Sequence, residues 1–199
     1  MTEEVMGVDL VDAQLRLAAG ERIADLGWRA QAERRPSGWA VQLRVNAETS
    51  GPAGEMMPSA GTLEIFDLPS GPGVRVETLG YRGFAMSAAF DQLLTKIITY
   101  SETSFDVAIA KGDRALGELQ VVGVDTNVAL LRSILGHPDF RDGRADTKFV
   151  ETHSAELSAD PRDWRSYHTD GIGQNIADSS PAEQWFDGHR ICEIGRAHV

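Results

Sequence analysis

The chain has 199 residues, which suits one domain of ordinary size or one domain with an extra piece. With 42% hydrophobic and 25% charged residues it is typical of a globular protein, and no apolar run approaches the roughly 20 residues that a membrane span needs. The net charge of −11 argues against nucleic acid as a partner, because no basic stripe is present to bind phosphates.

The first ten residues, "MTEEVMGVDL", lack the basic head and apolar core of a signal peptide, and we therefore expect a cytoplasmic protein. The single cysteine, Cys192, excludes an internal disulfide and agrees with that compartment. An acidic surface is common among such proteins and identifies no substrate.

The N-terminal segment predicts a helix over 10–18, followed by a strand over 38–49. Asp9 is a suitable N-cap, and the helix is expected to stop near Gly20. In "GWAVQLRVNAET" (38–49) apolar and polar residues alternate, as expected for a strand with one buried face. The apolar face would carry Trp39, Val41, Leu43 and Val45, and the polar face Gln42, Arg44 and Asn46. On pattern alone the polar face is the wet side of an antiparallel sheet; the alternative is that it lines a site where Arg44 meets an oxyanion.

Three further strands are predicted after a loop rich in glycine and proline. They cover "TLEIF" (62–66), "GPGVRVETLGY" (71–81) and "FDQLLTKIITY" (90–100). The first alternates, and the second is introduced by a turn. The third has apolar residues on both faces and is therefore expected to be buried.

At Thr103 or Ser104 the period changes from that of a strand to that of a helix. The apolar face of this helix would carry Phe105, Ile109, Leu116 and Leu119. Gly112 falls inside the helix, where glycine is destabilising.

A second helix is predicted from a cap at Asp125 or Thr126, with Val128, Leu131 and Leu135 on its apolar face. It ends at Gly136, and Pro138 blocks its extension. A short closing strand is predicted over 147–151, "TKFVE".

The order of helix, strands, two helices and strand predicts an α+β fold, an antiparallel β-sheet with flanking helices. After about residue 155 the apolar periodicity stops, and the chain is rich in Asp, Ser, Gly and Pro. We therefore expect 156–192 to be a linker or disordered tail.

The sequence contains no recognised metal-binding or nucleotide-binding motif. The histidines lie at positions 137, 153, 168, 189 and 198, with no H-x-x-x-H spacing and no cysteine partners, so no metal site is predicted. His137 follows a predicted helix, and we expect it to cap the last carbonyls of that helix. "GIGQNI" (171–176) lacks the third glycine of a dinucleotide fingerprint, and neither a phosphate-binding loop nor a serine nucleophile motif occurs.

Seven stretches together resemble the C-terminal region of biotin carboxylase, the ATP-dependent component of acetyl-CoA, propionyl-CoA and pyruvate carboxylases. They are "TEEVMGVDLVDAQLRLAAGE", "GWAVQLRVNAET", "PSAGTLEIF", "GPGVRVET", "FDQLLTKII", "GVDTNVALLRSIL" and "HPDFRDGRADTKFVE". They follow the order and spacing of the family over residues 2 to about 151. The resemblance implies a biotin carboxylase C-terminal domain over 23–155, preceded at 1–22 by the terminal helix of an ATP-grasp domain.

The resemblance also gives Arg44 a role. Arg44, in "LRVNAE", matches the family arginine that holds the ureido oxygen of biotin. Carboxylation requires that the ureido nitrogen lose its proton, which places negative charge on the ureido oxygen. A guanidinium has fixed donors and keeps its charge, so it stabilises this oxyanion better than a lysine would. Arg44 is therefore the expected catalytic residue of the biotin pocket.

Three other residues match family positions. Asp91, in "FDQLL", matches an aspartate near the biotin pocket; a carboxylate at a strand edge is the alternative interpretation. Arg75, in "GVRVE", matches a residue at the family's dimer interface, but alternation places it on the same face as Glu77, so an ordinary cross-strand ion pair is the competing interpretation. Thr147 falls where the closing segment of the family touches the adenine of the nucleotide.

The resemblance implies a reaction, its cofactors and its partners. The whole enzyme would use ATP, Mg²⁺ and bicarbonate to carboxylate biotin on a carrier domain. The carboxyl group then passes to an acyl-CoA or a 2-oxo acid on a carboxyltransferase domain or subunit, and the intact enzyme is a homodimer. ATP and Mg²⁺ would be bound mainly outside this chain.

The family's ATP-binding lobes, metal-binding glutamates and general base precede the position of Met1. We therefore expect a truncated fragment that is inactive by itself, in which Met1 stands for an internal valine whose GTG codon was taken as a start. Residues 193–199, "EIGRAHV", resemble the translation of a sequencing adapter and are expected to have no biological meaning. The alternative is a non-catalytic dimerisation or carrier-docking module that acts in trans with a separate ATP-binding chain.

Overall fold

The computed structural model describes residues 1–27, 36–50 and 56–159. These residues fall within one compact unit, Met1–Pro161. Most of the expected tail and all of the adapter-like sequence lie outside the described residues. None of the described helices is both long enough and apolar enough to cross a membrane.

Two short helices, α1 (Thr2–Met6) and α2 (Leu10–Ala18), begin the chain. The carboxylate of Asp9 accepts a hydrogen bond of 2.9 Å from the backbone N–H of Asp12, which confirms the predicted N-cap of α2. Just beyond the helix, Gly20 has a φ of 96°, a conformation that glycine adopts without strain.

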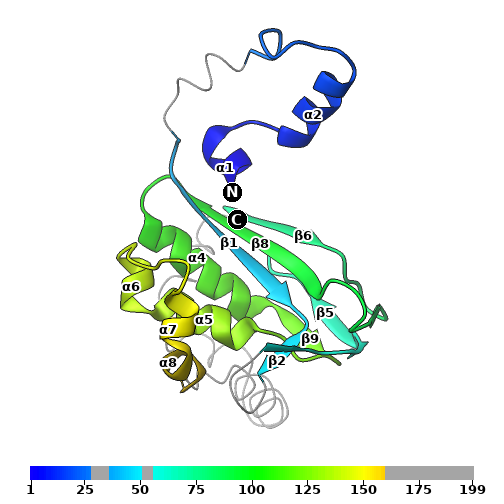
Figure 1. The fold of residues 1–199 in the computed structure, drawn as a ribbon, viewed down its shortest axis with the longest axis vertical. Helices are drawn as coiled ribbons and strands as arrows, with labels where there is room; N and C mark the ends of the chain where they lie inside the picture. Colours follow the sequence, from blue (N-terminus) through cyan, green and yellow to red (C-terminus); the bar gives the residue numbers. More distant parts are fainter. Residues whose placement is uncertain (28–35, 51–55, 160–199) are drawn as a thin grey trace, which may run out of the picture. The chain divides into compact units, whose positions relative to one another are not determined.

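A three-stranded antiparallel sheet forms the centre of the fold (Figure 1). Its order is β1 (Trp39–Asn46), β8 (Leu93–Ser101) and β6 (Val74–Thr78). The central strand β8 is buried or half-buried along its whole length, as expected. It begins three residues after the predicted start at 90, and Phe90 is 79% exposed. Its register places Lys96 opposite both Arg44 of β1 and Glu77 of β6.

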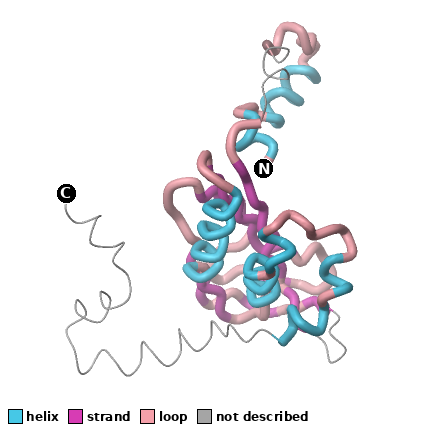
Figure 2. Tube along the Cα trace, turned by 90° about the vertical axis from the view of Figure 1, so that its left-hand side faces the viewer, coloured by secondary structure: helices cyan, strands magenta, loops and turns pink. Residues whose placement is uncertain are grey.

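One face of this sheet packs against α4 (Phe105–Glu118), which in turn contacts α5 (Val128–Gly136); Figure 2 shows the helices gathered against the strands. The β1 residues in this core are Val41, Leu43 and Val45, each no more than 5% exposed. Trp39 shares their side of the strand but is 43% exposed, because it stands at the first position of β1 and outside the core cluster. The prediction that Trp39 packs into the core is therefore wrong.

Gly112 marks the closest approach of α4 to the sheet. A Cβ atom at this position would lie 3.3 Å from a methyl carbon of Leu43 and from one of Leu135. On the same face, the hydroxyl of Thr99 donates a hydrogen bond of 2.8 Å to the carbonyl of Ala108. Glycine is unfavourable inside a helix, but because Gly112 has no side chain it lets α4 lie close to both the sheet and α5.

The predicted strand over 62–66 is divided between two partners. β4 (Gly61–Thr62) pairs with β7 (Ala85–Met86), whereas β5 (Ile65–Asp67) pairs with β9 (Gln120–Val122). The backbone N–H of Leu63 donates to Phe84 and that of Glu64 to Val122, so the pairing changes within two residues. A further short pair joins β2 (Glu48–Ser50) to β3 (Met56–Pro58).

The C-terminal part of the described chain is helical. It contains α6 (Pro138–Arg141), α7 (Phe149–Thr152) and α8 (Ser154–Ala159). The predicted closing strand over 147–151 is therefore wrong. This segment buries a single side chain, that of Phe149, and one turn of helix is enough to bury it. α8 buries Leu157 and carries the described structure four residues into the expected tail.

One predicted cap is confirmed and another lies at a different residue. The backbone N–H of His137 donates a hydrogen bond of 3.1 Å to the carbonyl of Ile134, which makes His137 the C-cap of α5, as expected. Its Nδ1 also accepts a hydrogen bond of 3.1 Å from the backbone N–H of Asp139, so the same residue caps the start of α6. The N-cap of α5 is Asn127, one or two residues beyond the predicted position. Its side chain makes no capping bond; it accepts from the N–H of Asn46 at 3.0 Å and donates to the carbonyl of Arg44 at 3.2 Å.

We predict that Asn127→Ala lowers the free energy of unfolding by about 1–3 kcal/mol, because it leaves two backbone groups of β1 without their partner. Urea unfolding monitored by circular dichroism measures the change. Thr126→Ala is the matched control and should stay within about 0.5 kcal/mol of the original chain. A larger loss of unfolding free energy in Thr126→Ala than in Asn127→Ala would contradict the prediction and support Thr126 as the N-cap.

Candidate functional site

Arg44 lies on the face of the sheet opposite the core. Its neighbours along β1, Leu43 and Val45, point into the core, so the alternation of the strand turns Arg44 away from it. The Arg44 side chain is exposed, and within the described residues it makes no ion pair. The guanidinium is therefore free to bind an anion.

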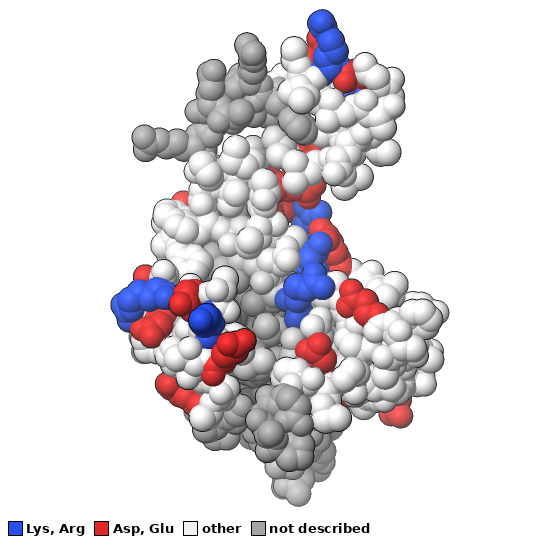
Figure 3. Space-filling view, viewed as in Figure 1, with Lys and Arg blue, Asp and Glu red and all other residues white. Residues whose placement is uncertain are grey.

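A row of charged side chains crosses this face beside Arg44. The ammonium group of Lys96 forms an ion pair with the carboxylate of Glu77 on the neighbouring strand. Glu77 also accepts a hydrogen bond of 2.5 Å from Arg75, two residues away on β6. Figure 3 shows Lys and Arg side chains gathered with acidic ones along the middle of the molecule.

The carboxylate of Glu77 is held in its charged form by its neighbours. The hydrogen bond from Lys96 is the largest cause that lowers the pKa of Glu77 below its ordinary value, and the charges of Lys96 and Arg75 lower it further. Partial burial opposes these effects. The negative charge of Glu77 thus offsets the positive charge of Lys96, while Arg44 has no ion-pair partner among the described residues.

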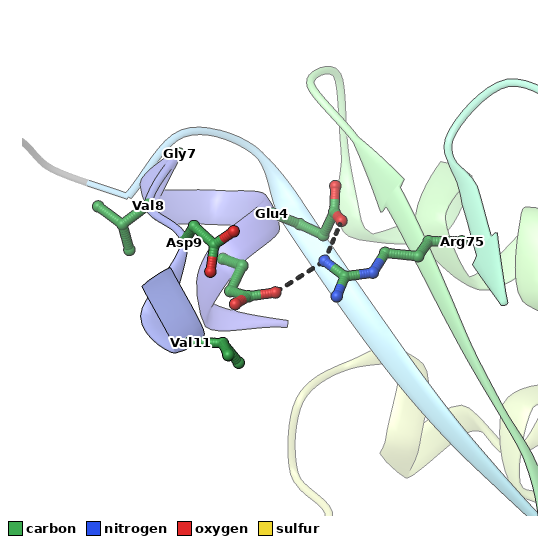
Figure 4. A pocket seen from close by; sticks show the side chains of 7 residues that line it. Glu4, Gly7, Val8, Asp9, Val11 and Arg75 are labelled. Carbon is green, nitrogen blue, oxygen red and sulfur yellow. Dashed lines mark hydrogen bonds and ion pairs between the residues drawn. The ribbon is translucent and has the colours of Figure 1, made fainter. Parts of the chain in front are cut away.

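Arg75 is engaged within its own chain. It donates to the carboxylates of Glu3 at 2.7 Å and Glu4 at 3.2 Å, both on α1 (Figure 4). It also donates to Glu77. The bond to Glu3, the largest cause, and those to Glu4 and Glu77 raise the pKa of Arg75, and the bond from Arg75 lowers the pKa of Glu3. The expected ion pair with Glu77 is present, but along one strand and not across two. The expectation that Arg75 lies at a dimer interface remains a prediction.

A shallow pocket of about 520 Å³ lies between α1 and Arg75 (Figure 4). Its lining residues are Glu3, Glu4, Gly7, Val8, Asp9, Val11 and Arg75. Of its three carboxylates, those of Glu3 and Glu4 are already paired with the guanidinium of Arg75, and that of Asp9 adds further negative charge. An anionic ligand would therefore find the polar face around Arg44 more favourable than this pocket.

Asp91 and Thr147 occupy separate places. Asp91 is exposed just before β8, where its carboxylate accepts a hydrogen bond of 3.0 Å from the N–H of Leu93. Because Asn46 of β1 pairs with Leu93, Asp91 lies at the end of the sheet that follows Arg44. Thr147 is exposed in the turn before α7, among the helices and not on the polar face.

Sequence reasoning missed the contribution of Lys96 and Asn127 to the site. Lys96 is the single charged residue in the apolar run "LLTKIITY", and that isolation was the signal that could have found it. Asn127 carries no such signal, because its bonds to Arg44 and Asn46 join residues more than 80 positions apart.

The chain is similar to known proteins over most of its described length. Residues 42–152 match the biotin carboxylase C-terminal domain family. The chain is 36% identical to biotin carboxylase 1 of Bacillus subtilis over 153 residues, which are 77% of this chain and 32% of that protein. It is 38% identical to human mitochondrial pyruvate carboxylase over 76% of this chain and 13% of that protein.

A solved structure agrees with these relatives. The biotin carboxylase domain of Hydrogenobacter thermophilus 2-oxoglutarate carboxylase, a dimer in complex with MgADP, ADP and bicarbonate, superimposes with a TM-score of 0.70 at 35% identity. The match covers 78% of this chain and 33% of that one. The chain thus spans about a third of the length of its biotin carboxylase relatives.

We predict that Glu77→Gln weakens the acid sensitivity of folding. Since the folded-state pKa of Glu77 is depressed, its ion pairs contribute stability above its ordinary pKa of 4.5 and lose it as the pH falls through the lower, folded value. Urea unfolding at a series of pH values from 7 down to 3 should therefore give a shallower loss of stability below pH 4.5 in Glu77→Gln than in the original chain. Glu64→Gln, at an exposed carboxylate, is the control; equal pH slopes for all three proteins would contradict the prediction.

Proposed function

The chain belongs to the biotin carboxylase family, whose C-terminal domain it carries, and we propose that it supplies the arginine that binds the ureido oxygen of carrier-bound biotin. The supporting observation is the exposed guanidinium of Arg44, which stands on a strand fixed by the core and makes no ion pair within the described residues. A fixed cation that no neighbour neutralises is what a developing oxyanion requires.

The surroundings of Arg44 suit this role. The amide of Asn127 bonds to the carbonyl of Arg44 and to the N–H of Asn46, so the backbone is held directly after the arginine. Lys96, directly opposite, is paired with Glu77 and adds no free charge. In the proposed step Arg44 donates hydrogen bonds to the ureido oxygen. The ureido nitrogen would give its proton to a general base on the ATP-grasp part of the enzyme and attack the carboxyl carbon of carboxyphosphate, from which phosphate would leave.

We extend the proposal to the whole enzyme. It would use ATP and Mg²⁺ to activate bicarbonate, carboxylate biotin on a carrier domain, and pass the carboxyl group to an acyl-CoA or 2-oxo acid at a carboxyltransferase. The solved complex with MgADP and bicarbonate supports the nucleotide and the anion, and its dimer supports a homodimer. Arg75 would lie at the interface between the two copies. Asp91 would orient the biotin pocket, and Thr147 would contact the adenine.

Part of the chain surface fits a larger assembly. Helix α2 exposes Val11 at 61% and Leu15 at 67%, and Ile23 beyond it is 61% exposed. Such an apolar surface is expected to pack against further protein. This supports 1–22 as the terminal helix of an ATP-grasp domain and 23–155 as the C-terminal domain. We further propose that residues 160–192 are a linker and that 193–199 have no role.

We predict that the purified 199-residue chain does not hydrolyse ATP in a manner that depends on bicarbonate and free biotin, since it corresponds to about a third of its biotin carboxylase relatives. Phosphate release measured with and without each substrate tests this. Release that depends on both substrates would contradict it. Activity that appears only when a separate ATP-binding chain is added would support the alternative, a module that acts in trans.

We predict that Arg44→Ala lowers biotin carboxylation about a hundredfold or more in a full-length biotin carboxylase that carries this chain as its C-terminal domain. Arg44→Lys should recover part of the rate, because lysine keeps the charge but not the paired donors. Carboxylation is measured beside thermal unfolding, and Arg82→Ala, at another exposed arginine, is the control. Carboxylation by Arg44→Ala at the rate of the Arg82→Ala control would show that the polar face is only a wet surface.

A further inference from the structure

Three side chains that can bind metal ions meet on the helical side of the fold, away from the polar face. A ring nitrogen of His137, a ring nitrogen of His153 and a carboxylate oxygen of Glu156 all lie within 4.8 Å of one another. Nε2 of His137 is 3.5 Å from Oε1 of Glu156, and the two imidazole rings have centroids 4.7 Å apart. Ligands at about 2.0–2.2 Å from one tetrahedral ion lie roughly 3–4 Å from each other, so the cluster is nearly at coordination distance.

His153 is already oriented as a ligand. Its Nδ1 lies 3.0 Å from the carbonyl of Phe149, which can only accept, so Nδ1 carries the proton and Nε2 keeps its lone pair. A metal-binding histidine commonly donates its other N–H to such an oxygen. The ring of Phe149 packs against both His137 and His153 and limits their rotation.

His137 must change its tautomer to bind through Nε2. Its Nδ1 accepts from the N–H of Asp139, so in the metal-free chain Nε2 carries the proton and points toward Glu156. Coordination moves the proton to Nδ1 and releases the cap of α6. That helix has only four residues, so the exchange costs one local hydrogen bond and leaves the core unchanged.

The charges around the cluster favour a divalent cation. Asp139 places a carboxylate oxygen 3.8 Å from Nε2 of His153, but it is paired with Arg144 at 2.5 Å. Glu156 makes no ion pair with a Lys or Arg among the described residues, so it supplies the uncompensated negative charge of the cluster. Two imidazoles with carboxylate oxygens, and no thiolate, suit Zn²⁺, Co²⁺ or Ni²⁺ better than the harder Mg²⁺ or Ca²⁺.

We propose that His137, His153 and Glu156 form a binding site for a divalent transition metal ion, which joins the end of α5 to α7 and α8. The sequence offers one signal for it: His153 and Glu156 stand three positions apart, a spacing that the search for H-x-x-x-H does not detect. The site is independent of Arg44 and of biotin carboxylation.

The test uses the full chain with His168, His189 and His198 changed to Gln and Cys192 changed to Ser, so that no histidine or cysteine beyond the described residues contributes. Titration with Co²⁺ is followed by its visible absorption, and Zn²⁺ is then added as a competitor. We expect one Co²⁺ per chain, displaced by Zn²⁺, and a higher unfolding temperature in the presence of Zn²⁺.

Variants in this background locate the ion. Glu156→Gln and His153→Gln should each weaken Co²⁺ binding by at least about tenfold, whereas Glu151→Gln, at an exposed carboxylate on α7, should not change it. His137→Asn keeps an acceptor for the cap of α6 but removes Nε2. It should lose Co²⁺ affinity, and its metal-free unfolding temperature, measured in parallel, separates this loss from that of the ring packing against Phe149.

Two results would overturn the proposal. The first is the absence of Co²⁺ binding by the background protein. The second is binding that is as tight in Glu156→Gln and His137→Asn as in the background. Either would show that the cluster is only a hydrogen-bonded contact between helices. The ¹⁵N shifts of the His137 ring give an independent readout, since Zn²⁺ must move the proton from Nε2 to Nδ1.

Discussion

The pairing of β1 with β8 in a single register determines where the charged side chains of this protein lie. Residues from Trp39 to Val45 pair in unbroken order with residues from Ser101 to Thr95. Because side chains alternate along a strand, a shift of one residue would bury Arg44 and expose Leu43. The core residues beneath α4 therefore fix the position of a guanidinium that they do not touch. Gly112 contributes to this constraint, since it lets α4 approach the sheet closely.

The pairing of β1 with β8 becomes irregular directly after Arg44, and a side chain from the start of α5 stabilises the irregular part. Between Val45 and Asn46 the pairing with β8 shifts. Such an irregularity leaves backbone groups of a strand without a partner in the sheet, and buried groups of this kind need another one. The amide of Asn127 bonds to the N–H of Asn46 and to the carbonyl of Arg44. The start of α5 thus completes the hydrogen bonding of the strand end, and it holds the backbone of Arg44 in place.

Elements that depend on local pattern could be predicted from the sequence, and those that depend on distant partners could not. The strands β1 and β8 and the helix capped by Asp9 follow from periodicity and capping. The predicted strand 38–49 is nevertheless divided, since β1 pairs with β8 and β2 with β3. The division of 62–66 depends on β7 and β9, which follow much later in the chain. The exposed face of Arg44 was predictable by alternation, whereas its neighbour Lys96 depends on register. The role of Arg44 toward biotin comes from the family resemblance and not from its strand.

The distribution of charge explains how an acidic protein can present a site for an anion. The net charge of −11 describes the whole chain, but the field at a bound group depends on charges within about one Debye length, roughly 8 Å at physiological ionic strength. On the polar face Lys96 is paired with Glu77, and Arg75 is shared among Glu3, Glu4 and Glu77. These groups carry two positive and three negative charges, all engaged in ion pairs with one another, whereas Arg44 makes no ion pair among the described residues. An oxyanion that forms at this face therefore meets one fixed guanidinium, and the acidic surface elsewhere is largely screened by salt.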